Sequence, residues 1–147
     1  MPLEIVPARP SHLDLLVPLF DAYRVFYDQP SDMEAARRFL EARLSAGDSV
    51  IFLALLDGPA GFTQLYPSFS SVSLKRLWIL NDLFVAAEAR RKAVASALLR
   101  RAQQHARDTG AKGLTLQTAR DNDAAQALYE AHGWEKDTAF WTYHRSA

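Results

Sequence analysis

A cluster of cations stands at the start of an expected helix, where side chains and backbone could bind an anion together. The helix follows a strand that is expected to end at Val85, so its first N–H groups and the positive end of its dipole would face an incoming phosphate. Small residues beside the cations would let a ligand approach the backbone. The residues concerned are Arg90, Arg91, Lys92, Ala93, Val94, Ala95 and Ser96. Basic residues at a helix start are also common on solvated surfaces, and from these residues alone that alternative stays open.

Asp82 is the acidic residue of an otherwise apolar run, residues 74–85, which has the composition of a strand covered on both faces. A carboxylate in such surroundings is a candidate general base. It is equally well interpreted as a structural carboxylate that nearby backbone or arginine groups satisfy. Its neighbour Asn81 cannot act as a base, because an amide does not take up a proton, and it would orient a substrate or a water molecule.

The pattern of apolar and turn residues predicts the elements that position these groups. The expected strands are 3–8, 49–56, 61–66, 74–85 and 112–118, with one or two closing strands in 134–145 and a serine-rich loop over 68–73. The expected helices run from about Ser11 to Tyr27, from Ser31 to near Gly47, from about Lys92 to Thr109, and over 121–132. Ser11 is the expected N-cap of the first helix, and Ser31 with Glu34 forms a capping-box pattern for the second. This order predicts an α/β fold, with a mixed sheet packed by helices, as a single domain over residues 1–147.

Composition excludes several classes of protein. Lys plus Arg equals Asp plus Glu at 17 each, which argues against a nucleic-acid ligand, because such proteins carry a basic excess. The absence of cysteine excludes a cysteine nucleophile, disulfides and thiolate metal sites. The four histidines, at 12, 105, 132 and 144, lack metal-ligand spacing and are interpreted as surface or cap residues, so no metal is expected. The start of the chain does not read as a secretory signal and no run is long enough for a membrane span, so a cytoplasmic location without membrane contact is expected.

Two ordered motifs resemble those of the GNAT superfamily of N-acetyltransferases. Motif A of that family reads Arg or Gln, two free positions, Gly, one free position, then Gly or Ala, and Arg90, Ala93 and Ala95 stand at those positions. The second signature is matched by Asn122, Ala125, Tyr129, Gly133 and Trp134. The run LNDLFV also resembles the central strand of the family, particularly that of spermidine/spermine acetyltransferases, and the resemblance covers nearly the whole chain.

The chain departs from motif A at two positions. Ala93 stands where the family normally has glycine, and Arg91 replaces a residue that is often glycine. Because the sequence after Arg91 favours a helix, we expect Ala93 to adopt the right-handed helical conformation, in which alanine is favoured over glycine.

The resemblance implies a GNAT fold, with a mixed sheet of six to seven strands, about four helices and a splayed central strand pair. It implies an acetyl-CoA-dependent N-acetyltransferase that acts on a primary amine of a small molecule, by direct attack in a ternary complex and without a covalent intermediate. The implied general acid is Tyr129, and Asp82 is the candidate base. The implied cofactor-binding groups are the backbone of Leu83, Phe84 and Val85, motif A, and Asn122 and Ala125. The implied substrate-binding residues are Tyr23, Tyr27, Tyr66 and Asn81. Without the motif, Tyr129 would be interpreted as an aromatic residue on the inner face of a helix.

Two other functions stay open at this point. Loss of the motif glycines would suit a non-catalytic acyl-CoA-binding or regulatory module, although the presence of both Tyr129 and Asp82 favours an enzyme. A protein acetyltransferase acting on a lysine or an N-terminus is the other alternative. The aromatic tail Phe140 to Tyr143 could also contribute to a homodimer interface.

Overall fold

The structure is a computed structural model that describes residues 2–91 and 93–147. The chain divides into two compact units, one up to Gln117 and one from Thr118 to Ala147. Each unit is described by itself. The prediction of a single domain over the whole chain stays a prediction.

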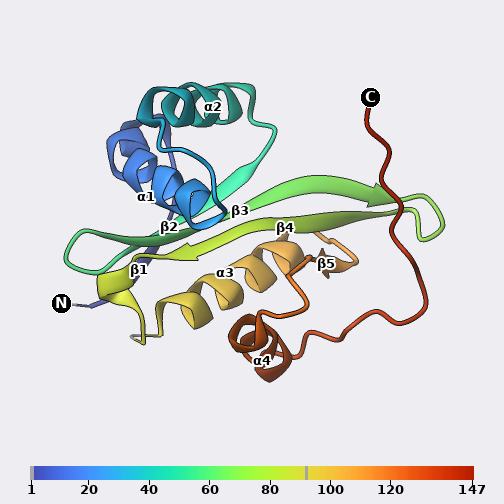
Figure 1. The fold of residues 1–147 in the computed structure, drawn as a ribbon. Helices are drawn as coiled ribbons and strands as arrows, with labels where there is room; N and C mark the ends of the chain where they lie inside the picture. Colours follow the sequence, from blue (N-terminus) through green and yellow to red (C-terminus); the bar gives the residue numbers. More distant parts are fainter. Residues whose placement is uncertain (1, 92) are drawn as a thin grey trace. The chain divides into compact units, whose positions relative to one another are not determined.

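In the described part of the first unit, five strands form one mixed sheet in the order β1-β2-β3-β4-β5 (Figure 1). The strands are β1 (Glu4–Pro7), β2 (Val50–Leu55), β3 (Pro59–Ser70), β4 (Lys75–Val85) and β5 (Gly113–Thr115). Neighbours from β1 to β4 pair antiparallel, and β4 pairs parallel with β5. The predicted mixed sheet is confirmed.

The predicted count of six to seven strands is wrong, because residues 134–147, all of which are described, form no strand. Two large apolar residues of this tail, Phe140 and Trp141, are adjacent and both are exposed. Because these side chains are not buried, the tail lacks the side-chain packing that stabilises a strand in a sheet.

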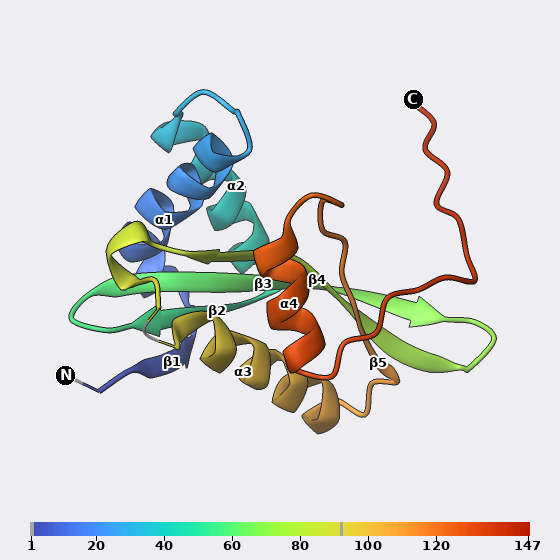
Figure 2. The same ribbon diagram turned by 60° about the horizontal axis from the view of Figure 1, so that its bottom comes forward.

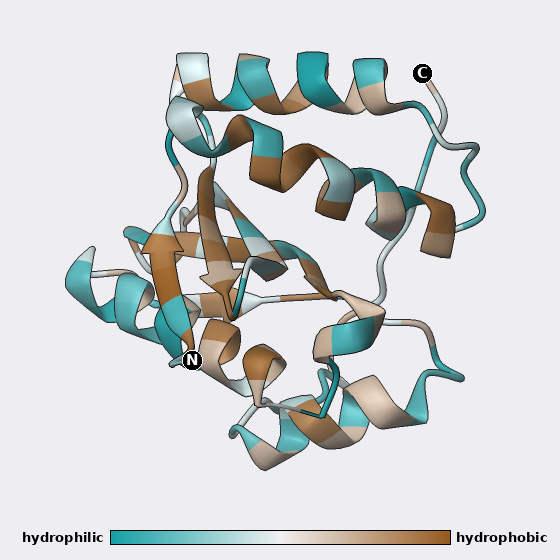
Figure 3. Cartoon of the chain, turned by 90° about the vertical axis from the view of Figure 1, so that its left-hand side faces the viewer, coloured by the Kyte–Doolittle hydropathy of each residue, from teal (hydrophilic) through white to brown (hydrophobic). Residues whose placement is uncertain are grey.

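Helices cover both faces of the sheet of the first unit. The helices α1 (Leu13–Phe26) and α2 (Met33–Ala46) lie on one face and α3 (Val94–Asp108) lies on the other (Figures 1 and 2). The apolar side of α1 faces the sheet while α2 exposes mostly polar residues (Figure 3), and the buried residues of α1 include Leu16, Val17 and Phe20. From α3 the predicted inward residues Val94, Leu98, Leu99 and Ala102 are buried. The sheet is therefore the middle layer of this unit, with two helices on one face and one helix on the other.

The starts of the two N-terminal helices differ from the predictions. Ser11 lies inside a short 3-10 turn, η1 (Pro10–His12), and α1 begins only at Leu13, so Ser11 is not an N-cap. The N-cap of α2 is Asp32, whose carboxylate accepts a hydrogen bond from the Ala35 N–H at 3.0 Å, so the expected capping box of Ser31 and Glu34 is wrong.

The Ser31 hydroxyl has a different partner. It donates to the buried carboxylate of Asp21 at 2.6 Å, and the backbone N–H of Asp32 donates to the same carboxylate at 2.7 Å. Asp21 therefore ties α1 to the start of α2, and satisfying this buried charge takes the serine away from the cap.

Two antiparallel hairpins carry the central strands. The turn predicted at 57–59 joins β2 to β3 but lies at residues 56–58, because Pro59 already pairs as the first residue of β3. The next hairpin is longer than expected, because β3 continues to Ser70 and only residues 71–74 form its turn. The Arg76 guanidinium lies 4.7 Å from the centre of the Phe69 ring across this hairpin, a cation–π contact that helps to hold the added strand residues.

Close approach of β3 and β4 requires glycine at one position. A Cβ atom on Gly61 would lie 2.6 Å from the backbone oxygen of Phe84 and 3.4 Å from a methyl group of Val94. The glycine therefore lets β4 and the start of α3 pack directly against β3.

In the second unit, α4 (Asp123–Ala131) forms where the sequence predicts a helix. The side chain of Asn122 accepts a hydrogen bond from the Ala125 N–H at 3.2 Å, which confirms Asn122 as an N-cap. Gly133 follows with φ +84°, the left-handed conformation that glycine tolerates after a helix.

Candidate acetyl-CoA and amine site

Among the described residues of the link between β4 and α3, two are in the left-handed conformation. After β4 ends at Val85, a short 3-10 turn η2 spans Ala87–Ala89 and α3 begins at Val94. Arg91 has φ +64°, and Ala93, the N-cap of α3, has φ +63° and ψ +17°. Lys92, predicted to contact the same anion, lies outside the described residues.

The expectation that Ala93 is right-handed helical is therefore wrong. Its φ and ψ are those of the left-handed region, in which an L-residue with a Cβ is disfavoured by about 1–2 kcal/mol. Helix propensity acts only from Val94 onward, because the chain must first turn out of the link from β4. Both positions at which the family pattern often has glycine, 91 and 93, thus adopt the conformation that glycine favours.

The start of α3 retains the features of an anion site. The side chain of Ala93, the N-cap, has no polar atom that could cap the helix, and no acidic residue lies in the first turn. Arg91 and Ala93 are exposed, and Ala95 and Ser96 are half-buried in that turn. The helix dipole and the neighbouring cations therefore favour a phosphate here.

The Arg90 side chain makes a hydrogen bond within the link between β4 and α3. Its Nε donates to the backbone oxygen of Val85 at 3.3 Å, which bridges the end of β4 to the residues before α3. Since Nε is held by the chain, the terminal nitrogens of this exposed guanidinium are the part best placed to meet an anion.

One edge of β4 is left without a strand partner toward its end. The β4–β5 pairs among the described residues run only from Leu77–Gly113 to Ile79–Thr115, whereas β4 continues to Val85. The strand pair therefore separates early, as predicted, and Leu83, Phe84 and Val85 lie in the part of β4 that pairs with β3 alone.

A β-bulge interrupts β4 at Asn81. Leu80 pairs with Leu65 of β3, but the next pair joins Asp82 to Gln64, so Asn81 is the extra residue on β4. Such a bulge bends the strand and changes the face to which later side chains point.

Ring contacts show this change of face. Before the bulge, the Trp78 ring lies 4.7 Å from the His105 ring of α3. After it, the Phe84 ring lies 6.0 Å from the Tyr23 ring of α1, on the opposite face of the sheet. Both residue numbers are even, so without the bulge these side chains would point the same way. Asp82, two residues before Phe84, lies on the α1 face with it.

Asp82 is buried, and each oxygen of its carboxylate accepts one hydrogen bond from a side-chain amide. Its carboxylate accepts from Gln64 Nε2 at 2.6 Å and from Asn81 Nδ2 at 3.0 Å, and its backbone oxygen accepts from the Thr63 hydroxyl at 2.7 Å. Only 4% of Asp82 is exposed. The partners are amides and not the backbone or arginine groups expected from the sequence.

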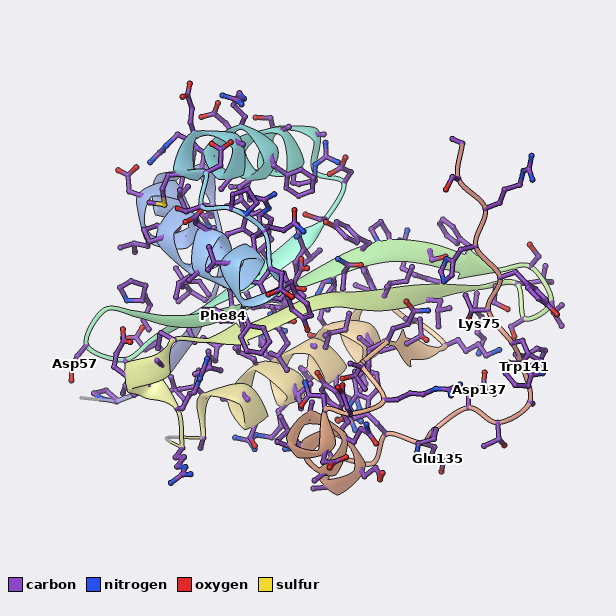
Figure 4. The ribbon with its side chains drawn as sticks, viewed as in Figure 1. Asp57, Lys75, Phe84, Glu135, Asp137 and Trp141 are labelled. Carbon is purple, nitrogen blue, oxygen red and sulfur yellow. The ribbon has the colours of Figure 1, made fainter. Side chains whose placement is uncertain are left out.

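Three of the predicted substrate residues lie together beside the bulge. The Tyr23 hydroxyl donates to the backbone oxygen of Asn81 at 3.4 Å, and the Tyr23 and Tyr27 rings meet edge to face at 5.2 Å. Figure 4 shows Phe84 on β4 near the end of α1, where its ring completes this aromatic cluster. The sequence prediction that α1 contributes to the same region as β4 agrees with these contacts.

Tyr66 is the fourth predicted substrate residue. Burial is the main cause that raises its pKa to about 12, and the negative charge of Asp82 adds to the effect. Tyr66 is therefore a neutral phenol at physiological pH, able to donate or accept a hydrogen bond.

Sequence reasoning missed Gln64 and misinterpreted His105. Gln64 is completely buried, and the signal for it was a polar residue inside the apolar strand pattern of 61–66. His105, expected at the surface or as a cap, instead packs edge to face on Trp78 and Phe52. Burial lowers its pKa, and the nearby Arg101 charge lowers it further.

The second unit holds the other predicted site residues. Asn122 caps α4 through the Ala125 N–H, so its structural role is established while a role toward the cofactor stays a prediction. The Tyr129 ring lies 6.0 Å from the Trp134 ring, and the backbone N–H of Trp134 donates to the backbone oxygen of Tyr129. The motif residues thus lie at both ends of α4, with Asn122 and Ala125 at its start and Tyr129 and Trp134 in contact at its end.

Comparison with known proteins decides the family. Residues 16–134 match the Acetyltransferase (GNAT) family. The chain belongs to the GNAT family. It is therefore an acetyl-CoA-dependent acetyltransferase, as its two motifs predicted.

Related proteins agree with this family. The chain is 50% identical over 142 residues to the uncharacterized N-acetyltransferase YhfO of Bacillus subtilis (strain 168), a match that covers 96% of this chain and 95% of that protein. It is 29% identical over 135 residues to a probable acetyltransferase of Haemophilus influenzae, with 90% of each chain covered. A crystal structure of a probable acetyltransferase superposes with a TM-score of 0.93 at 52% identity, covering 98% of this chain and 97% of that one. None of the helices in the described residues has the length and apolar character to span a membrane.

Proposed function

We propose that this GNAT enzyme transfers the acetyl group of acetyl-CoA to a primary amine of a small molecule by direct attack in a ternary complex. The observation that carries the proposal is the placement of two different sites along β4. The bulge at Asn81 lies beside aromatic side chains and a buried carboxylate, and the anion site follows directly after Val85.

The link after β4 suits the pyrophosphate of acetyl-CoA, which supplies the activated acetyl group. The helix start of α3, without a side-chain cap, and the cations Arg90 and Arg91 offer positive potential, and Ala95 and Ser96 keep the first turn accessible. We extend this proposal to Lys92 on the sequence motif alone. The backbone of 83–85 has an edge without a strand partner and would hold the acyl arm, where a fixed N–H can stabilise a developing oxyanion.

Two side chains are proposed for proton transfer. A carboxylate has about four acceptor positions, and the amides of Gln64 and Asn81 occupy two at Asp82, so the carboxylate keeps capacity to take a proton from the amine, directly or through a water molecule. Tyr129 would supply the proton that the departing thiolate needs.

The substrate would be bound by the residues around the bulge. Tyr23, Tyr27 and Tyr66 supply aromatic surface and hydroxyl groups, and Asn81 supplies an amide. A small molecule suits this proposal better than a protein lysine, because the groups are gathered at one bend of a strand.

Release of free thiol from acetyl-CoA tests the proposal. The purified protein is mixed with acetyl-CoA and a panel of polyamines, amino acids and aminoglycosides, and thiol is measured over time. We expect release with a subset of the amines and a 1:1 acetylated product by mass spectrometry. Binding of acetyl-CoA without release from any amine would favour the non-catalytic module, and release only with a lysine-containing peptide would favour a protein acetyltransferase.

We also propose that the enzyme forms a homodimer through the aromatic tail. Phe140, Trp141 and Tyr143 are each more than 80% exposed, which is unusual for large apolar side chains in a monomer. Light scattering should give twice the chain mass, and a chain mass at all concentrations would contradict the idea.

A further inference from the structure

A chain of hydrogen bonds runs through the sheet beneath the bulge. The Ser49 hydroxyl donates to Gln64 Oε1 at 2.9 Å, Gln64 Nε2 donates to Asp82 Oδ2 at 2.6 Å, and Asn81 Nδ2 donates to Asp82 Oδ1 at 3.0 Å. Gln64 is 0% exposed. A fully buried amide destabilises the folded state unless both its oxygen and its nitrogen are hydrogen-bonded, and both are bonded here.

The direction of each bond in this chain is fixed by its members. A carboxamide accepts at its oxygen end and donates at its nitrogen end, whereas a carboxylate only accepts. Since the Asp82 carboxylate only accepts, the nitrogen end of Gln64 must face it, which leaves the oxygen end of Gln64 to accept from the Ser49 hydroxyl. The second oxygen of the same carboxylate then takes the nitrogen end of Asn81, so the Asn81 oxygen Oδ1 is the end directed away from Asp82.

Asn81 is the one member of this chain that is exposed at the bulge. Its backbone oxygen also accepts the Tyr23 hydroxyl at 3.4 Å, so the residue is held from two sides. Its Oδ1 is the group directed toward a ligand and pairs with an N–H donor, while Nδ2 keeps one hydrogen on Asp82 and has a second hydrogen beside it.

We propose that Gln64 is a positioning residue that sets the amide orientation of Asn81 and thereby selects a substrate carrying N–H donors. This inference rests on the proposed amine acetylation. Gln64 acts through Asp82, whose carboxylate it holds in the rotamer that binds the Asn81 nitrogen. Loss of Gln64 frees the Asp82 carboxylate to rotate, and the Asn81 amide bonded to it is then no longer held with Oδ1 toward the ligand.

The chain contains a matched control for this test. Gln104 also donates from Nε2 to a carboxylate, that of Asp108 at 2.8 Å, but the pair is exposed on α3. The same substitutions at Gln104 therefore change an equivalent bond with no connection to the bulge.

Steady-state kinetics with Gln64→Met, Gln104→Met and the wild type gives the first readout. We expect Gln64→Met to raise the KM for the amine about tenfold, the effect of one lost hydrogen bond to a substrate, and to change the KM for acetyl-CoA less than about twofold. Gln104→Met should change neither. Equal changes in both KM values, or a loss of kcat alone, would overturn the inference.

Gln64→Glu gives a readout that a purely structural role would not move. The charge of Asp82 opposes ionisation of a carboxyl in contact with it, so at low pH the new acid keeps a proton and donates it to Asp82 as the amide did. Relative to the wild type, the KM for the amine should be near unchanged at about pH 6 and should rise several-fold by about pH 8.5 as this proton is lost. The other titratable groups nearby are Tyr23 of α1, Tyr66 of β3, Arg43 of α2 and Asp48 before β2, and they are the same in both proteins. If the KM for the amine of Gln64→Glu, divided by that of the wild type, does not change with pH, the inference is contradicted.

The Asn81 side-chain amide signals in an NMR spectrum provide a readout that does not depend on turnover. In the wild type, one amide proton should be protected from exchange by its bond to Asp82, and Gln64→Met and the milder Ser49→Ala should remove that protection while Gln104→Met leaves it. If the wild type acetylates no amine, the proposed function fails while this measurement still decides the role of Gln64. Unchanged Asn81 signals in a folded Gln64 or Ser49 variant would overturn the inference.

Discussion

Replacing Ala93 with glycine should stabilise the enzyme, although glycine within a helix usually does the opposite. At φ +63° the alanine Cβ is in conflict with its own backbone, and glycine removes that conflict. The substitution takes away only a methyl group on an exposed residue, so little packing is lost. The sign of the effect therefore reports the backbone conformation.

The magnitude follows from two opposing terms. Relief of the left-handed conformation is worth about 1–2 kcal/mol, and the greater freedom of glycine in the unfolded chain costs about 0.4–1 kcal/mol. The net gain in the free energy of unfolding is about 0.5–1 kcal/mol, which for a chain of this size raises the Tm by about 1–4 °C.

Ala95→Gly is the matched control, because it removes the same atom two residues later. Position 95 lies in the right-handed first turn of α3, where glycine is less stable than alanine by about 0.5–1 kcal/mol. Urea unfolding of the two variants beside the wild type should give shifts of opposite sign. A loss of stability in both variants would refute the left-handed assignment at Ala93.

The remaining predictions concern catalysis, pH and packing. Tyr129→Phe should lower kcat about 10²- to 10⁴-fold while the KM for acetyl-CoA changes little, and unchanged turnover would remove Tyr129 from the proposed mechanism. Burial holds the pKa of His105 below 6.5 in the folded state, so as the pH falls the unfolded chain binds a proton at this residue before the folded chain does. The free energy of unfolding should therefore fall as the pH drops below about 6.5. His105→Leu should weaken this dependence in urea unfolding between about pH 7 and 5. Gly61→Ala should cost about 1–3 kcal/mol in the free energy of unfolding, because the new methyl group would lie against the backbone oxygen of Phe84, and a Tm equal to that of the wild type would show that β3 and β4 can move apart.

Elements with a strong local pattern could be predicted from the sequence. The buried positions of α3, which recur every three or four residues, and the Asn122 cap of α4 both depend on a few neighbouring residues, and both are confirmed. The grouping of Tyr23 with β4 was expected from family resemblance, and the ring contacts support it. These features depend on short-range chemistry or on a family pattern that spans the chain.

The errors arise where a distant contact overrides a local preference. Ser31 has the residue type of a cap, but the buried Asp21 carboxylate attracts its hydroxyl. Ala93 favours a helix, but the link from β4 imposes a turn before α3 can begin. The partners of Asp82 depend on which residue of β3 lies opposite, and strand register is not visible in a single sequence.

The bulge at Asn81 also bears on how this enzyme should be compared with its relatives and redesigned. Because one extra residue places Asp82 and Phe84 on the α1 face, a relative that lacks it would align well by residue type yet present those side chains to α3. Transfer of a substrate preference between such proteins would require a one-residue insertion or deletion in β4 and not only exchanges of side chains. Sequence identity along this strand is therefore a poor guide to shared substrates unless the length of the strand is also conserved.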